Sequence, residues 1–323
     1  MADRELVELL DQAVESVLGG RSPDAAGNPE LAALAEIAGR LRDLPDENFK
    51  TRLKIELQRR SSVTASTMEG TSARFRTVTP FLIHENAPEL VEFLKSVFGA
   101  QELKRDTGAT AYAFYSEVQI GDATILIGGG EAARRGNLPS ALHVYVEDCD
   151  AAYRRALDAG AVTLMGDRGE PTDRPYGERS AAVEDRFGNY WYIATRLTPA
   201  PTAEGLGTVF PYLHPQGARK YIDFLKRAFD AEEIAVYEQA DRVMHAAVRV
   251  GNAVIEMGEP QDAAGIPSNG LFLLVEDVDG AYARALDAGA KAVRPPQDIP
   301  YQLRSAIVRD PAGYLWWTGR WIR

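Results

Sequence analysis

Residues 146–161 read VEDCDAAYRRALDAGA, and residues 275–290 read VEDVDGAYARALDAGA, identical at 13 of 16 positions. An internal match of this quality indicates a duplicated structural unit. The register extends outward, because VTPFLIHENAPELVEFLKSVFGA (78–100) matches VFPYLHPQGARKYIDFLKRAFDA (209–231). The chain is therefore best analysed as a tandem repeat.

The end of each repeat is also marked in the sequence. DRFGNYWYI (185–193) matches DPAGYLWWT (310–318). We predict that the copies occupy residues 72–197 and 205–323. The segment between them, TPAPTAEGLG, is rich in proline, glycine and small residues, as an interdomain linker should be.

Within each copy the apolar residues alternate between a period of two and a helical period of about 3.6. In the first copy TPFLIH predicts a strand, an apolar stripe from Leu90 to Val97 predicts a helix closed by Gly99, and strands follow near 110–120 and 123–128. LHVYVED then begins the same series again. Each copy is predicted to hold two βαβββ units, so the fold class is α+β with four units in total. Each unit is too small to bury its own sheet and helix, so the units must pair.

The second helix of the first copy has its own boundary signals. Asp150 is a plausible N-cap, and Gly160 ends the apolar stripe. Two strands are predicted to follow, near 179–184 and 189–195.

The first 66 residues do not belong to the repeat. Apolar stripes at Leu6 to Val17 and at Leu31 to Leu41, and a third after Asp46, predict a helical segment over 1–66. It is either a module for docking a protein partner or for self-association, or a structural appendage of the main body. SSVTASTMEGTSA at 61–73 is typical of a flexible tether.

Composition excludes several classes of function. A net charge of -11 and a pI near 5.0 provide no basic surface for nucleic acid or anionic lipid. The N-terminus lacks an export signal, and no stretch approaches the roughly 18 apolar residues of a membrane span. Cys149 is the single cysteine, so one chain can form neither a disulfide nor a cysteine-rich zinc site. These features favour a cytoplasmic protein.

The motifs F-L-K-x-x-F, V-E-D-x-D-x-A-Y-x-R-A-L-D-A-G-A and D-x-x-G, repeated in βαβββ units, resemble the vicinal oxygen chelate superfamily. That superfamily includes glyoxalase I, bleomycin-resistance proteins and extradiol dioxygenases, and the PhnB-like branch is the most similar. The resemblance covers both copies but not the first 66 residues. It implies that paired units form a curved sheet with a ligand on its concave face and helices outside. The duplication is then expected to form an internal pseudo-dimer with two unlike clefts.

Enzymes of this superfamily hold a divalent metal with His and Glu side chains from four strands of a domain. The resemblance places these positions at Thr79, Leu126, Ala141 and Tyr192 in the first copy, and at Phe210, Glu256, Gly270 and Trp317 in the second. Only Glu256 is a metal-ligating residue, and one carboxylate cannot hold such an ion. We therefore expect no metal and no other cofactor.

Strand alternation separates the two faces of the sheet, because residues two apart share a face. In HAAVRVGNAVIEMG (245–258) a turn at Gly251-Asn252 places Val250 opposite Ala253 and Ala247 opposite Glu256. One predicted face packs under the helices and includes Met244, Ala246, Val248, Val250, Ile255 and Met257. The inner face is predicted to hold Phe81, Tyr115, Glu117, His143, Tyr145, Tyr190, Tyr192, Phe210, Tyr212, His214, His245, Arg249, Glu256, Phe272 and Trp317.

An inner face lined by aromatic rings with a few polar groups suits an apolar aromatic small molecule. The alternative is that several of these rings pack the seam between the copies. His245 and Arg249 lie diagonal to Glu256 across the hairpin, within reach of its carboxylate. That group is interpreted as a structural salt bridge, a ligand anchor or an acid–base pair. Glu117 is either the matching patch of the first copy or a solvated residue.

Three functions follow from these features. The first is a metal-independent binding protein of the bleomycin-resistance type, which sequesters or carries an aromatic ligand, as in antibiotic resistance. The second is a metal-free isomerase, cyclase or lyase that uses Glu256 and His245 as acid and base. The third is a ligand-responsive regulator that acts through the helical N-terminus. Whether the chain is an enzyme stays open at this point.

Overall fold

The structure is a computed structural model that describes residues 75–107, 114–130, 133, 136–164, 169–197, 207–260, 266–300 and 302–322. The predicted N-terminal helices, the tether and most of the linker lie outside these residues. None of the described helices is long and apolar enough to cross a bilayer.

The described chain forms four modules, in which a strand and a helix precede further strands. The first contains β1 (Val78–Ile83), α4 (Ala87–Phe98), β2 (Gln101–Asp106), β3 (Phe114–Ile120) and β4 (Ala123–Gly129). The second contains β5 (Ala141–Tyr145), α5 (Cys149–Asp158), β6 (Val162–Thr163), β7 (Thr172–Arg174), β8 (Glu178–Glu184) and β9 (Tyr190–Arg196). The α+β class and the tandem units are as predicted.

The third and fourth modules repeat this order. The third contains β10 (Val209–Leu213), α6 (Ala218–Phe229), β11 (Glu232–Gln239), β12 (Arg242–Val250) and β13 (Ala253–Met257). The fourth contains β14 (Gly270–Leu274), α7 (Val278–Asp287), β15 (Lys291–Ile299), β16 (Leu303–Arg309) and β17 (Leu315–Trp321).

The modules pair across the two copies rather than within them. One eight-stranded sheet runs β15-β16-β17-β14-β1-β4-β3-β2, so it joins the fourth module to the first. One nine-stranded sheet runs β11-β12-β13-β10-β5-β9-β8-β6, with β7 also paired to β8, and joins the third module to the second. Each junction is antiparallel, with Thr79 opposite Phe272 on β1 and β14, and Phe210 opposite His143 on β10 and β5. The pairing expected of a fused duplication is thus present in both sheets.

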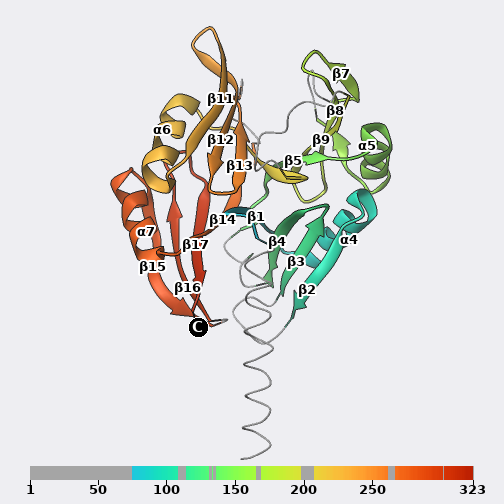
Figure 1. Cartoon of the computed structure of the whole chain (residues 1–323). Helices are drawn as coiled ribbons and strands as arrows, with labels where there is room; N and C mark the ends of the chain where they lie inside the picture. The colour runs from blue at the N-terminus through green and yellow to red at the C-terminus, as the bar shows by residue number, and fades with distance from the viewer. Residues whose placement is uncertain are drawn as a thin grey trace, which may run out of the picture. The chain divides into compact units, whose positions relative to one another are not determined.

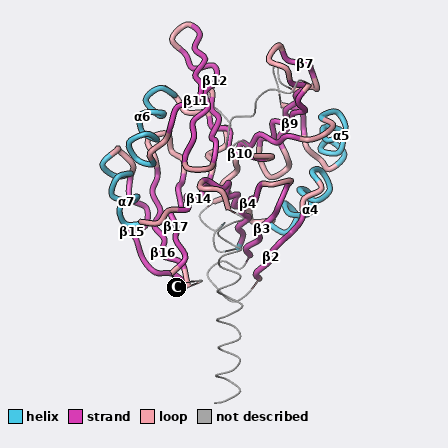
Figure 2. The backbone as a smooth tube through the Cα atoms, viewed as in Figure 1, coloured by secondary structure: helices cyan, strands magenta, loops and turns pink. Residues whose placement is uncertain are grey.

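The helices lie on the outer faces of the sheets, α4 and α5 on one side and α6 and α7 on the other (Figures 1 and 2). Beneath them lie two apolar cores, one for each copy. The second core includes Ala246, Val248, Val250, Ile255 and Met257, as strand alternation predicts.

Met244 is an exception to the predicted alternation. Val243, rather than Met244, packs in the core. Tyr237 of β11 pairs with His245 and the next residue, Glu238, pairs with Val243, so the register of β12 against β11 shifts by one residue at Met244. This bulge leaves one residue of β12 without a partner on β11. Alternation predicted from a regular strand is therefore wrong at this point.

The N-cap of α5 also differs from the prediction. Asp148, not Asp150, accepts a hydrogen bond of 2.9 Å from the Ala151 backbone N–H. The helix begins at Cys149, so Asp150 lies in its first turn and its carboxylate accepts a hydrogen bond of 2.8 Å from Arg179 Nη2. Asp277 caps α7 in the same way through the Gly280 N–H.

Two matched hydrogen-bond clusters tie the copies together. Thr208, which leads into β10, donates from its backbone N–H (2.7 Å) and hydroxyl (2.8 Å) to Asp122 Oδ1 in the β3–β4 turn. Thr77, which leads into β1, donates to Asn252 Oδ1 in the β12–β13 turn at 2.7 and 3.0 Å. The β3–β4 turn of the first copy and the β12–β13 turn of the second are thus each hydrogen-bonded to the residue that precedes the first strand of the other copy.

Asp122 also forms an ion pair with Arg76 Nη2 at 2.6 Å, but its side chain is 56% exposed, where ion pairs contribute little. We therefore predict that the cluster at Asp122 stabilises the fold mainly through its hydrogen bonds with Thr208. Asp122→Ala should lower the free energy of unfolding by about 1–2 kcal/mol, because two donors of Thr208 lose their acceptor. Asp122→Asn should retain most of this energy, because asparagine performs the same role at position 252. Urea denaturation of the full chain measures both, and an equal loss in the two variants would contradict the hydrogen-bond explanation.

Cys149 is predicted to be an unreactive thiol. Its side chain is buried and contacts the Ile193 carbonyl oxygen at 3.4 Å, and burial raises the pKa of the thiol to about 11. A thiol reagent at neutral pH should therefore label the folded protein only as fast as it unfolds. Rapid labelling of the native chain, compared with a urea-denatured control, would show that this prediction is wrong.

Candidate functional site

The inner faces of the two sheets have different chemistry at matched positions of the repeat. On the nine-stranded sheet these positions hold polar or ring-bearing polar residues: His143, Tyr145, Glu178, Tyr190, Tyr192, Arg196, Tyr212, His214, His245 and Glu256. On the eight-stranded sheet the corresponding residues, in the same order, are mostly apolar: Phe272, Leu274, Leu303, Leu315, Trp317, Trp321, Phe81, Ile83, Tyr115 and Leu126.

The apolar side chains of the eight-stranded sheet pack on one another as a third core. Phe81 and Trp317 meet edge to face with ring centroids 4.9 Å apart, and Phe272 lies 6.5 Å from Phe75. All three of the predicted ligand-wall residues Phe81, Phe272 and Trp317 belong to this buried cluster. The structure therefore favours the alternative that these rings are packing residues.

Tyr115 and Glu117 lie on the same sheet and contact each other. The Tyr115 hydroxyl donates to Glu117 Oε1 at 3.2 Å, and Lys104 Nζ lies 3.8 Å from the same oxygen. The Glu117 side chain is 4% exposed. The interpretation of Glu117 as a solvated residue is therefore wrong.

Glu256 is the centre of the polar group on the nine-stranded sheet. It lies opposite Ala247 on β12, as predicted, and opposite Tyr212 on β10. Its Oε2 is 3.3 Å from His143 Nδ1 and 3.4 Å from His245 Nε2. The side chains of Glu256 and His143 are 12% and 11% exposed, whereas that of His245 is 40% exposed. We call these three residues the Glu–His cluster.

The electrostatics of the Glu–His cluster favour an ionised carboxylate. Burial alone would raise the pKa of Glu256. Hydrogen bonds from His143 and His245, and the charge that their rings carry when protonated, outweigh burial and hold the pKa at about 2. A buried carboxylate that stays ionised is a strong acceptor for a nearby donor.

Aromatic rings surround the Glu–His cluster. The rings of His143, Tyr145 and Phe210 contact one another, with the His143 centroid 4.7 Å from Tyr145 and 4.9 Å from Phe210. Tyr192 and Tyr212 lie 4.8 Å apart, and the Tyr192 hydroxyl is 2.9 Å from His214 Nε2.

These rings come from both copies of the repeat. The predicted inner-face residues His143, Tyr145, Tyr192, Phe210, Tyr212, His214 and His245 are all brought together here.

Arg249 forms an ion pair that was not predicted. The ion pair described for Arg249 is with Glu232 on β11, at 3.6 Å, and the groups that set the pKa of Glu256 are the two histidines. Arg249 also lines a cavity of about 360 Å³ with Arg284 and Phe229. The partner that sequence reasoning missed is His143, which reaches Glu256 only because β10 joins β5.

The structure also changes which residues occupy two of the superfamily's metal-ligand positions. His143, not Ala141, lies opposite Tyr192, and Phe272, not Gly270, lies opposite Trp317. The eight-stranded sheet thus offers no set of metal ligands at these positions. On the nine-stranded sheet both histidines approach the same oxygen of Glu256, and the described residues contain no group of three or more His, Cys, Asp or Glu arranged to hold an ion. The donor set does not fit the metal of the superfamily.

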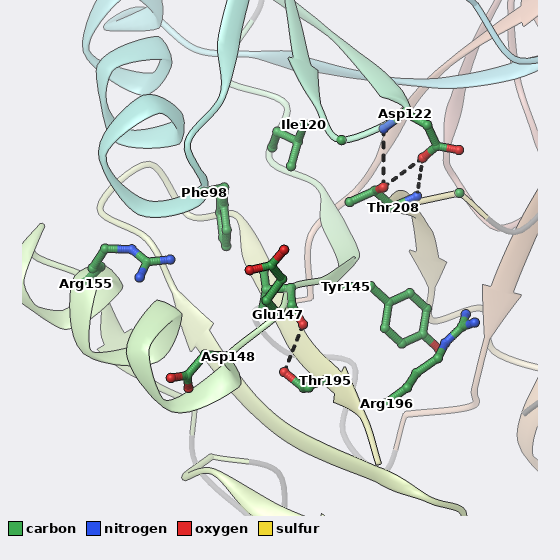
Figure 3. Close-up of a pocket in the computed structure, with 13 residues that line it drawn as sticks. Phe98, Ile120, Asp122, Tyr145, Glu147, Asp148, Arg155, Thr195, Arg196 and Thr208 are labelled. Atoms are coloured by element: carbon green, nitrogen blue, oxygen red, sulfur yellow. Dashed lines mark hydrogen bonds between the residues drawn. The ribbon is translucent and has the colours of Figure 1, made fainter. Parts of the chain in front are cut away.

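An open cavity of about 1000 Å³ lies at the ends of β5 and β9, lined mainly by the end of α4, the β3–β4 turn and the start of α5 (Figure 3). Tyr145 and Arg196 line it together, and the Arg196 guanidinium stacks 4.0 Å from the Tyr145 ring centroid. The Tyr145 hydroxyl donates to Glu178 Oε1 at 2.6 Å. Because the Tyr145 ring also packs on His143, one ring lies between the cavity and the Glu–His cluster.

We predict that ionised Glu256 stabilises the folded state at acidic pH. Its folded pKa of about 2 lies below its ordinary value of 4.5, so the stabilisation is complete above pH 4.5 and is lost as the pH falls toward 2. The loss should reach about 3 kcal/mol over this window. Urea denaturation as a function of pH should show this loss in the native chain but not in Glu256→Gln, and parallel curves would contradict it.

Comparisons with known proteins agree on the family. The model of the Glyoxalase/Bleomycin resistance protein/Dioxygenase superfamily matches residues 76–193 and 216–318. The uncharacterized protein Mb0911c of Mycobacterium bovis is 32% identical over 126 residues, which cover 36% of this chain and 80% of that protein.

Solved structures show the same fold at low identity. Glyoxalase I from Zea mays is 14% identical with a TM-score of 0.56, over 75% of this chain and 92% of that one. A putative dioxygenase from Bacillus subtilis is 14% identical with a TM-score of 0.50, over 75% and 83%.

Proposed function

The chain belongs to the Glyoxalase/Bleomycin resistance protein/Dioxygenase superfamily, and from this premise we propose that it is a metal-independent binding protein for an aromatic small molecule. The proposed site is the inner face of the nine-stranded sheet. The observation that carries the proposal is the buried Glu–His cluster surrounded by rings from both copies. Sequestration or carriage of the ligand in the cytoplasm, as in antibiotic resistance, is the role proposed for such a site.

The contrast between the two sheets supports this choice of site. Rings pack on one another on both sheets, as Phe81 and Trp317 do at 4.9 Å and Tyr192 and Tyr212 do at 4.8 Å, so the polar groups are what distinguish the two faces. Polar rings around a buried carboxylate instead provide both flat apolar surface and hydrogen-bonding groups, which is the usual composition of a small-molecule site.

A second candidate is a metal-free enzyme of the same fold, with Glu256 and His245 as base and acid. The observation that favours it is the exposure of His245, whose Nε2 is 3.4 Å from the buried carboxylate. A regulator that acts through residues 1–66, by a protein partner or self-association, is a third hypothesis. That segment lies outside the described residues.

We predict that His245→Ala weakens the binding of a neutral aromatic dye. N-phenylnaphthylamine, whose fluorescence rises in apolar surroundings, should bind the full chain and lose roughly threefold to tenfold in affinity in this variant. Tyr115→Ala is the matched control, because Tyr115 occupies the same position of the repeat on the eight-stranded sheet. Tyr115→Ala should bind the dye with the affinity of the native chain. A chelator should not change the affinity of either protein.

The results of these binding measurements distinguish the proposed functions. Equal loss in His245→Ala and Tyr115→Ala, or dependence of binding on a metal, would contradict the proposed site. If a substrate is found, Glu256→Gln should abolish turnover and retain binding for an enzyme, whereas for a carrier it should weaken binding alone.

A further inference from the structure

We propose that His143 Nε2 is the hydrogen-bond acceptor that selects the ligand, so that the site prefers an aromatic molecule with an O–H or N–H donor, such as a phenol. This inference rests on the proposed function and names the class of ligand. It depends on how Glu256 holds the His143 ring.

The contact with Glu256 fixes which nitrogen of His143 carries hydrogen. Glu256 Oε2 is 3.3 Å from His143 Nδ1, and an ionised carboxylate can only accept a hydrogen bond. Nδ1 is therefore the donor, and in the neutral ring Nε2 has a free electron pair and can only accept. Glu256 acts here as a positioning residue, because it sets the tautomer of a neighbouring side chain.

The Nε2 atom lacks the partner that its burial demands. His143 is 9% exposed, and within the described part of the chain its buried Nε2 has no hydrogen-bond partner. A buried polar atom without a partner is unfavourable, so a ligand that donates to it gains affinity.

The surroundings of His143 restrict that donor to a flat molecule. Tyr145 and Phe210 lie against the ring at 4.7 and 4.9 Å, and Tyr145 also lines the cavity of about 1000 Å³. A flat donor that reaches Nε2 therefore lies against aromatic rings. The matched position on the other sheet is Phe272, which has no acceptor.

The test compares two probes that differ only in the donor: a naphthol and its methyl ether. Titration calorimetry on the full chain should show the naphthol binding roughly threefold to tenfold more tightly than the ether. His143→Phe, chosen because Phe272 occupies the matched position, should remove this preference, so that naphthol and ether bind this variant with equal affinity. Glu256→Gln is the second variant and should reduce the preference, because an amide can also donate and so does not fix the tautomer.

The nitrogen resonances of His143 in the native chain provide a test that needs no variant. The inference predicts that Nδ1 has the shift of a protonated nitrogen and Nε2 that of an unprotonated one, and that naphthol shifts Nε2. A protonated Nε2, or equal binding of naphthol and ether, would overturn this inference and leave the proposed function standing. Binding of neither probe would overturn both.

Discussion

The antiparallel pairing of β10 with β5, and of β1 with β14, is the constraint on which the rest of the structure depends. These first strands of the modules have an open edge, and an open edge must find a partner. Because the partner comes from the other copy, Glu256 and His143 are brought together although 113 residues separate them in sequence. Neither copy alone contains the Glu–His cluster.

Duplication allows the two sheets to differ. In a symmetric dimer of single domains both inner faces must have the same residues, since the same sequence forms both. Here the matched positions of the fused copies hold Glu256 on one sheet and Leu126 on the other, and likewise His143 and Phe272. One inner face can therefore pack largely as an apolar core, with Glu117 as a buried exception, while the other holds the Glu–His cluster. This division explains why the proposed ligand site is confined to the nine-stranded sheet.

Much of this arrangement could be predicted from the sequence, because the repeat and the two periodicities are strong signals. The register of the hairpin, with Ala247 opposite Glu256, follows from a two-residue turn alone. The edge strands β2, β11 and β15 were not predicted, since their exposed and charged residues provide no apolar alternation. The contact of His143 with Glu256 could not be predicted either. It depends on which copy supplies the partner strand, and no local pattern specifies that choice.

The central claim is that the nine-stranded sheet binds an aromatic ligand and the eight-stranded sheet does not. The most direct measurement is nuclear magnetic resonance of the full chain with labelled aromatic rings, recorded during addition of an aromatic compound. The account predicts that the ring signals of Tyr192 and Tyr212 shift with occupancy while those of Phe81 and Trp317 stay in place. Shifts confined to Phe81 and Trp317 would contradict it.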